Sequence, residues 1–167
     1  MAAAPHPARQ RENSFVRRVR KFVTVNIDVA LARRRSASVA VLMASEGSVG
    51  SIHEAVALGD RRAVAAHLQR QPECVLHRDD EQRTPLLLAA AAGDCTTVTV
   101  LIRRMGHHDA GAINWPDLSG LTPLHWACTQ QRYEVVELLL RHGASTEAED
   151  EDGRRPIHSV AFAGNVR

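Results

Sequence analysis

The sequence contains little cysteine and no long apolar run, and each of these shortages excludes a class of protein. The 167 residues include three cysteines, Cys74, Cys95 and Cys128. An odd and widely spaced set of cysteines provides neither a disulfide framework nor a zinc motif, so we expect a reducing, intracellular location. No run approaches the roughly 20 apolar residues that a membrane-spanning helix requires. The hydrophobic content of 44% is sufficient for one modest core.

Charge is distributed unevenly along the chain. Residues 1–45 hold nine basic and two acidic residues, a net charge of 9 − 2 = +7. Residues 46–167 hold twelve basic and seventeen acidic residues, a net charge of 12 − 17 = −5. Lys21 is the only lysine among the basic residues. The chain is therefore expected to be a basic arm attached to an acidic domain.

The arm, residues 1–47, shows two different patterns. Residues 1–10 are rich in alanine and proline and are expected to be disordered. Apolar residues between Phe15 and Val23 follow helical spacing with arginines between them, whereas the stretch from Val23 to Leu31 alternates as a strand does. Both interpretations stay open, so we predict only a basic and partly disordered arm.

The same basic composition fits several roles. It is typical of a mitochondrial transit peptide, of a nuclear import signal, of a segment that binds anionic lipid or nucleic acid, and of a solvated segment without a role of its own. Ser14 and Ser36 follow arginines as in sites of basophilic kinases, and we take both as candidate phosphorylation sites. Phosphate groups there would lower the positive charge of the arm.

The acidic domain is organised around residues 117–144. Asp117 and Gly120 predict a turn, because glycine reaches positive φ without steric cost and aspartate bonds nearby backbone. Thr122 is placed to cap a helix that has Pro123 at its first position. A second apolar helix follows over residues 133–142 and stops at Gly143, where a left-handed cap is expected. The stretch therefore predicts a turn, a helix, a tight reversal and a second helix.

This unit recurs along the chain. Aligning copies on His125 places His53, Leu87 and His158 at the same position, with spacings of 34, 38 and 33 residues. The second copy repeats Thr-Pro-Leu at residues 84–86, and the first and fourth copies keep Ile-His at residues 52–53 and 157–158. A period near 33 with this motif resembles the ankyrin repeat.

The resemblance implies an all-α fold, a helical solenoid with β-turn or hairpin tips, over residues 48–167. We place the repeats at about 48–78, 79–116 and 117–149, with a partial fourth repeat at 150–167. The fourth copy has no second helix, and solenoids need a covered or polar end. We therefore expect the chain to be a fragment or truncated product of a longer ankyrin protein, or to complete its end against a partner.

Three positions depart from the repeated pattern. Gln82 and Gln131 stand where other copies have glycine, which predicts left-handed backbone at a cost of about 1 kcal/mol each. Arg155 stands where the capping threonine is expected, and loss of such a cap costs about 1 kcal/mol. In the intact copies, the histidine of the motif is expected to bond the capping hydroxyl and nearby backbone.

No pattern in the sequence predicts catalysis or the binding of a cofactor. His107 and His108 lie in the long connection before the third repeat, with no third ligand nearby, so we expect no metal site there. Trp115 in the same connection is expected to cover the seam between repeats. No Ser/Cys-His-Asp grouping and no Gly-rich phosphate loop occurs in the repeats, and we expect neither an enzyme, a cofactor nor a small-molecule substrate.

The function implied by the resemblance is binding of a protein partner, as an adaptor or regulatory scaffold, through the turn tips and the concave face. Two of the three tips are acidic, which favours a partner with a basic segment. The alternative is a membrane- or nucleic-acid-associated protein whose arm does the binding. We expect a cytoplasmic location, with nuclear and mitochondrial locations as alternatives. The candidate partner-binding residues are Asp80, Glu81, Arg83, Leu118, Ser119, Leu121, Thr129, Gln130, Glu151, Asp152, Arg154 and Phe162.

Overall fold

The structure, a computed structural model, describes the backbone of residues 50–164 and the side chains of residues 50–160. The helices in this range are α3 (Ile52–Leu58), α4 (Arg61–Arg70), α5 (Pro85–Ala92), α6 (Cys95–Met105), α7 (Pro123–Thr129), α8 (Tyr133–Arg141) and α9 (Pro156–Gly164). Two 3-10 segments, Pro72–Leu76 and Ala110–Asn114, follow α4 and α6. The expectations for the arm, including its helical and strand patterns, lie outside the described residues.

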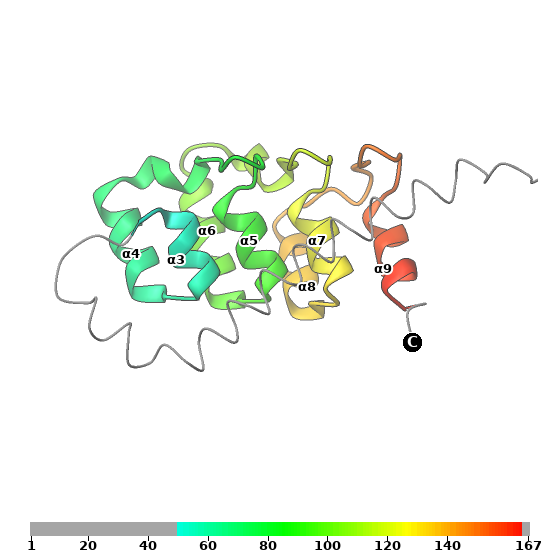
Figure 1. Cartoon of the computed structure of the whole chain (residues 1–167), viewed down its shortest axis with the longest axis horizontal. Helices are drawn as coiled ribbons and strands as arrows, with labels where there is room; N and C mark the ends of the chain where they lie inside the picture. The colour runs from blue at the N-terminus through cyan, green and yellow to red at the C-terminus, as the bar shows by residue number, and fades with distance from the viewer. Residues whose placement is uncertain (1–49, 165–167) are drawn as a thin grey trace, which may run out of the picture. The chain divides into compact units, whose positions relative to one another are not determined.

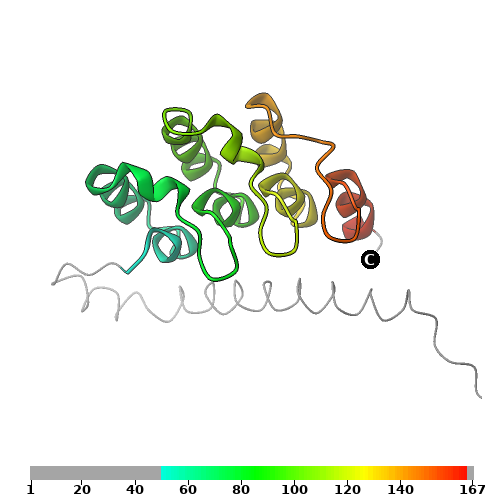
Figure 2. The same ribbon diagram turned by 90° about the horizontal axis from the view of Figure 1, so that it is seen from above.

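The helices form two rows. The first helices of the repeats, α3, α5, α7 and α9, lie side by side in one row, and α4, α6 and α8 form a second row behind them (Figures 1 and 2). The turns that precede α5, α7 and α9 project beyond the first row, as Figure 2 shows. Among the described residues no strand occurs. The predicted all-helical solenoid is confirmed.

The first helices begin where the capping residues predict. The hydroxyls of Thr84 and Thr122 accept hydrogen bonds from the backbone N–H three residues later, and proline occupies the first position of α5 and α7. Ser51 performs the same role for α3. Each cap satisfies one of the backbone donors that a helix start leaves free.

The second helices begin in two different ways. The carboxylates of Asp60 and Asp94 each accept hydrogen bonds from two backbone N–H groups at the starts of α4 and α6. At α8 the corresponding residue is Arg132, which makes no side-chain cap. Instead, its Nε donates to the carbonyl of Ala91 at 3.3 Å, at the end of α5. Arg132 therefore links the third repeat to the second.

The two glutamines predicted to adopt left-handed backbone do so. Gln82 has φ 59°, in the left-handed region like Gly120 and Gly153 at the same position of the other tips. Gln131 has φ 55°, in the same region as Gly59 and Gly93, which end the equivalent helices α3 and α5. The prediction is confirmed. At both positions the turn imposes the backbone conformation on a residue that disfavours it.

Replacing Gln131 with glycine is expected to raise the free energy of unfolding by up to about 1 kcal/mol, because the relief of left-handed strain exceeds the entropy that glycine adds to the unfolded chain. Urea unfolding measures this change in the free energy of unfolding. The matched control is Gln130→Gly at the preceding residue, where φ is −89° and glycine should be destabilising. Equal destabilisation by both variants would contradict the argument.

Candidate functional site

Three turn tips, at residues 79–83, 117–121 and 150–154, form the most regular surface feature of the repeats. Each tip starts with an aspartate, and its Oδ1 accepts two backbone N–H groups, from the residues two and four positions later, at 2.8–3.0 Å. The three starting residues are Asp79, Asp117 and Asp150. These bonds fix the loop around a single carboxylate, so each tip has a defined backbone.

Main-chain hydrogen bonds join each tip to the next. The N–H of Leu118 donates to the carbonyl of Glu81 at 3.1 Å, and the N–H of Glu151 donates to the carbonyl of Ser119 at the same distance. The tips approach closely at Gly120, where a Cβ atom would lie 2.8 Å from the N atom of Glu151. The three tips therefore form one continuous row.

The imidazole of His125, on α7, is hydrogen-bonded to the row of tips. Its Nε2 lies 3.0 Å from the carbonyl of Arg154, and its Nδ1 accepts from the N–H of Thr122 at 3.2 Å. With Nδ1 accepting, we assign the proton to Nε2, which then donates to the next tip. His53 reaches the carbonyl of Arg83 in the same way, at 3.0 Å. The expected bond between the motif histidine and the capping residue is confirmed at His125.

Burial changes the ionisation of the groups beneath the tips. It lowers the pKa of His125, against the opposing effects of the Arg154 carbonyl and nearby carboxylates. Burial also raises the pKa of Asp117, although Trp126 donates its Nε1–H to this carboxylate at 2.9 Å. For Asp79, burial alone would raise the pKa, but hydrogen bonds from Arg83 outweigh it and the pKa is lowered.

The exposed members of the predicted site lie on the tips. Their side chains are those of Asp80, Glu81, Leu118, Glu151 and Asp152. Asp80, Leu118 and Glu151 occupy the same position of successive tips, and Leu118 is 60% exposed. The row therefore presents an apolar side chain between two carboxylates.

The remaining predicted residues are less accessible. The half-buried group comprises Arg83, Ser119, Thr129, Gln130 and Arg154. Arg83 forms ion pairs with Asp79 at 2.7 Å and with Glu81 at 3.1 Å. Thr129 and Gln130 lie at the end of α7, and Thr129 donates its hydroxyl to the carbonyl of His125. Phe162 has a side chain outside the described range, as do Ser14 and Ser36.

Leu121 needs a correction. We expected it to contact a partner, but its side chain is 6% exposed and belongs to the core. It stands directly before the capping Thr122, where the chain turns inward. The equivalent residues, Arg83 and Arg154, can extend a charged end to solvent from the same position, and leucine cannot.

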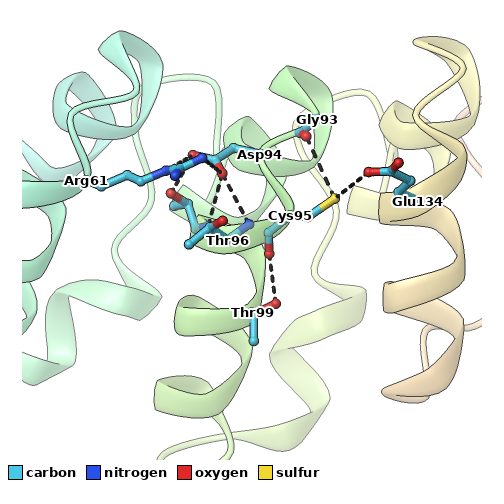
Figure 3. Close-up of polar contacts among 8 residues, drawn as sticks. Arg61, Gly93, Asp94, Cys95, Thr96, Thr99 and Glu134 are labelled. Atoms are coloured by element: carbon cyan, nitrogen blue, oxygen red, sulfur yellow. Dashed lines mark hydrogen bonds and ion pairs between the residues drawn. The ribbon is translucent and has the colours of Figure 1, made fainter.

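Long-range side-chain pairs join the second helices and were not predicted. Arg61 at the start of α4 binds the carboxylate of Asp94 with two nitrogens, at 2.9 and 3.2 Å. The Sγ of Cys95 lies 3.6 Å from a carboxylate oxygen of Glu134. Figure 3 shows both contacts, which connect α4 to α6 and α6 to α8. The partners are 33 and 39 residues apart, and only the alignment of the repeats could have suggested them.

The long connection is fixed by its own contacts. The guanidinium of Arg78 lies over the Trp115 ring, 4.6 Å from its centroid. Asn114 accepts from the N–H of Ser145 at 2.8 Å. Trp115 thus covers part of the seam between repeats. Within residues 50–164, no group of three His, Cys, Asp or Glu side chains could hold a metal ion.

The described helices are also too short or too polar to cross a membrane.

The geometry defines a stack of two-helix repeats whose tips are hydrogen-bonded into one row. This arrangement is that of a helical repeat protein.

The comparison with family models agrees with this geometry. A model for ankyrin repeats, in three copies, matches residues 52–150. The chain belongs to the ankyrin-repeat family.

Similar proteins share only parts of their length with this chain. Inversin from Canis lupus familiaris is 28% identical over 111 residues, which are 66% of this chain and 10% of inversin. Human BCL-6 corepressor-like protein 1 is 34% identical over 58 residues, 35% of this chain and 3% of that protein. Human 2-5A-dependent ribonuclease is 46% identical over 48 residues, 29% of this chain and 6% of the ribonuclease. The chain thus spans a tenth or less of these relatives.

Among solved structures, a chain in the crystal structure of the yeast ribosomal protein Rps3 in complex with its chaperone Yar1 has a similar fold. The TM-score is 0.64 at 23% identity, covering 68% of this chain and 82% of that chain. At this identity the match supports the fold alone.

Gly120→Ala should destabilise the row of tips more than Gly153→Ala does. Both glycines have positive φ, 76° and 72°, so both variants carry the left-handed penalty of about 1 kcal/mol. Only at Gly120 would the added Cβ meet the backbone of the next tip, whereas nothing lies within 4 Å at Gly153. We expect an additional loss of at least about 1 kcal/mol at Gly120, measured by urea unfolding. Equal losses would argue against close contact between the tips.

His125→Leu should lower the free energy of unfolding at pH 7 by about 1–3 kcal/mol, because the Arg154 carbonyl loses its donor. It should also flatten the pH dependence. The folded pKa of His125 lies below the ordinary 6.5, so the unfolded chain binds the proton more readily and stability falls as pH drops below about 6.5. Unfolding at pH 7, 6 and 5 tests this, with exposed His108→Leu as the control. An equally steep decline in His125→Leu would contradict the assignment.

Proposed function

We propose that this chain is a non-catalytic protein-binding module, an adaptor or regulatory scaffold, that holds a protein partner along its row of tips and the adjoining ends of its first helices. The observation that supports this most directly is the row itself. Hydrogen bonds from Leu118 and Glu151 lock three neighbouring tips together. A surface that is already ordered loses little conformational entropy when a partner binds.

The side chains on the row favour a partner that carries both charge and an apolar anchor. The tips contain two leucines, of which Leu118 is exposed and Leu121 is buried. Asp80 and Glu151 occupy the position of Leu118 in the tips on either side. A basic segment with a central apolar side chain matches this order. The charges would increase the association rate and select the partner, while the apolar contact supplies affinity.

The arginines of the tips do not cancel this preference. Arg83 is held between Asp79 and Glu81, and Arg154 lies 3.5 Å from Asp152. Their charge is therefore directed toward carboxylates of their own tips. The side chains of Asp80 and Glu151 are exposed, and they give the outer edge of the row its negative character.

The structural neighbour offers a parallel for this use. It lies in a complex of a ribosomal protein with its chaperone, and we propose that the present chain likewise acts by binding another protein. The match to 2-5A-dependent ribonuclease covers 6% of that enzyme, so it gives no reason to propose a nuclease activity. Catalysis is also disfavoured because the motif histidines bond backbone carbonyls and caps rather than a nucleophile.

A second candidate function rests on the charge of the arm. Residues 1–45 carry +7, enough to bind an anionic membrane or nucleic acid without the repeats. Such binding should weaken steeply with added salt, because it releases counterions. Binding to a protein partner through Leu118 should depend much less on salt.

Affinity capture from a cell lysate with the full chain tests the proposed function. Leu118→Arg should lose the captured proteins, because it places a charge at the apolar anchor of the row. Val100→Arg is the matched control, since Val100 is also an exposed apolar residue, on α6 in the second row of helices. A third variant replaces Arg17, Arg18 and Arg20 with alanine.

Each outcome separates the candidates. Loss with Leu118→Arg and retention with Val100→Arg supports the row of tips. Loss only in the arm variant would assign the function to residues 1–45 and contradict the proposal. For a protein captured through the row, Asp80→Asn with Glu151→Gln should reduce the association rate several-fold at low salt.

A further inference from the structure

The connection between α8 and the tip at residues 150–154 carries an exposed hydroxyl in front of a run of acidic residues (Figure 2). The hydroxyl belongs to Thr146, and Glu147 follows it directly. Glu149 stands three positions after Thr146, and each of the next three residues is acidic. A hydroxyl with carboxylates one and three positions further on is the charge pattern that acidophilic serine/threonine kinases, whose substrate grooves are basic, select.

The structure leaves Thr146 accessible in a segment without regular secondary structure. Among the described side chains, the exposed serine and threonine residues are Ser51, Thr96 and Thr146. Ser51 caps α3, and Thr96 lies in the first turn of α6. A kinase must take the acceptor segment into its groove, so a hydroxyl held in a helix becomes available only when the helix opens. Thr146 needs no such opening.

The two adjacent hydroxyls of this connection differ in how firmly they are held. The N–H of Ser145 donates to the Oδ1 of Asn114 at 2.8 Å, and its Oγ accepts from the N–H of Glu147 at 3.2 Å. In the described part of the chain, the latter is the one hydrogen bond made by the main chain of residues 146–149. Thr146 instead donates its hydroxyl to the exposed carboxylate of Glu147 at 3.3 Å. The geometry therefore favours Thr146 over Ser145 as an acceptor.

The carboxylates that a basic groove would recognise face the solvent. The side chains of Glu147 and Glu149 are 69% and 55% exposed, and both pair with Arg155, at 2.6 and 3.4 Å. Exposed ion pairs of this kind contribute little free energy, so basic side chains of a kinase can replace Arg155. Asp150 differs, because it is buried in the tip.

We propose that Thr146 is a phosphorylation site for an acidophilic serine/threonine kinase that uses MgATP. The Oγ1 of Thr146 forms a bond to the γ-phosphorus of ATP, while the bond from that phosphorus to the oxygen bridging to the β-phosphate breaks. ADP leaves, and the hydroxyl proton passes to the catalytic aspartate of the kinase. Glu147 and Glu149 bind basic side chains of the groove and thereby hold the hydroxyl in line with ATP.

The phosphate changes the charge beside the last tip. It adds about −1.5 to −2 charges. One carboxylate, that of Glu147, contacts both the hydroxyl of Thr146 and the guanidinium of Arg155, so the phosphate forms near a cation that can bind it. The added charge makes the end of the row more attractive to a basic partner. This effect rests on the proposed function, whereas the site itself does not.

Incubation of the full chain with a purified acidophilic kinase and MgATP, followed by peptide mass spectrometry, tests the site. We expect phosphate on Thr146 and its loss in Thr146→Ala. Glu149→Gln should lower the initial rate roughly tenfold, because a charge-assisted contact with the groove is lost. The matched control is Glu137→Gln, which removes another exposed glutamate that pairs with an arginine, Arg141 on α8, and should leave the rate unchanged.

The opposite results are equally clear. A chain without phosphate on Thr146, or one modified mainly on Ser145 or Ser51, would overturn the proposal. Equal rates for Glu149→Gln and Glu137→Gln would overturn it as well. The assay contains no binding partner, so a negative result leaves the proposed function standing. For a protein captured through the row of tips, phosphorylation should raise the association rate several-fold at low salt, and an unchanged rate would contradict the effect on the row.

Discussion

The structure depends on one constraint: no repeat can bury its own apolar face. Leu86 and Leu124 are fully covered because the following repeat packs against each of them, and the same contact brings successive tips within hydrogen-bonding distance. The tip-to-tip bonds and the histidine braces are therefore consequences of helix packing rather than independent elements. Stability in such a stack is approximately a sum of terms from each repeat and from each interface between neighbours.

The interfaces are not built alike. Between the third and fourth repeats, His125 bonds the Arg154 carbonyl and a main-chain bond joins the tips. Between the second and third, Leu87 stands at the histidine position and supplies no such bond, but Arg132 donates to the Ala91 carbonyl from the other end of the helix. The hydrogen bond that links neighbouring repeats thus lies at the tip end of the first helix in one interface and at the opposite end in the other. Both arrangements satisfy a carbonyl that packing has removed from water.

Local features of the fold could be predicted from the sequence, and features that depend on distant residues could not. The caps at Thr84 and Thr122 and the left-handed Gln131 follow from chemistry within a few residues, so the pattern of one repeat was sufficient. Leu121 was assigned to the surface because its tip was expected to be exposed throughout, whereas a tight turn points some side chains inward. To predict the ion pair of Arg61 and Asp94, one must know how closely two repeats approach each other. Composition and spacing do not give that distance.

Within each tip some residues shape the loop and others only meet the solvent, so the exposed residues can differ between repeats on one scaffold. The first aspartate and the left-handed residue shape the loop, and the carbonyl and N–H groups of the backbone join it to its neighbours. Asp80, Leu118 and Glu151 share a position at which the main-chain N–H of Leu118 and of Glu151 joins the tips, while all three side chains are exposed. Exposed charges at such a position contribute little to stability, so substitution there changes the exposed surface while the row keeps its geometry. An apolar residue between two acids is thus compatible with the same backbone, and the exposed side chains of the row can vary with little cost to the stability of the stack.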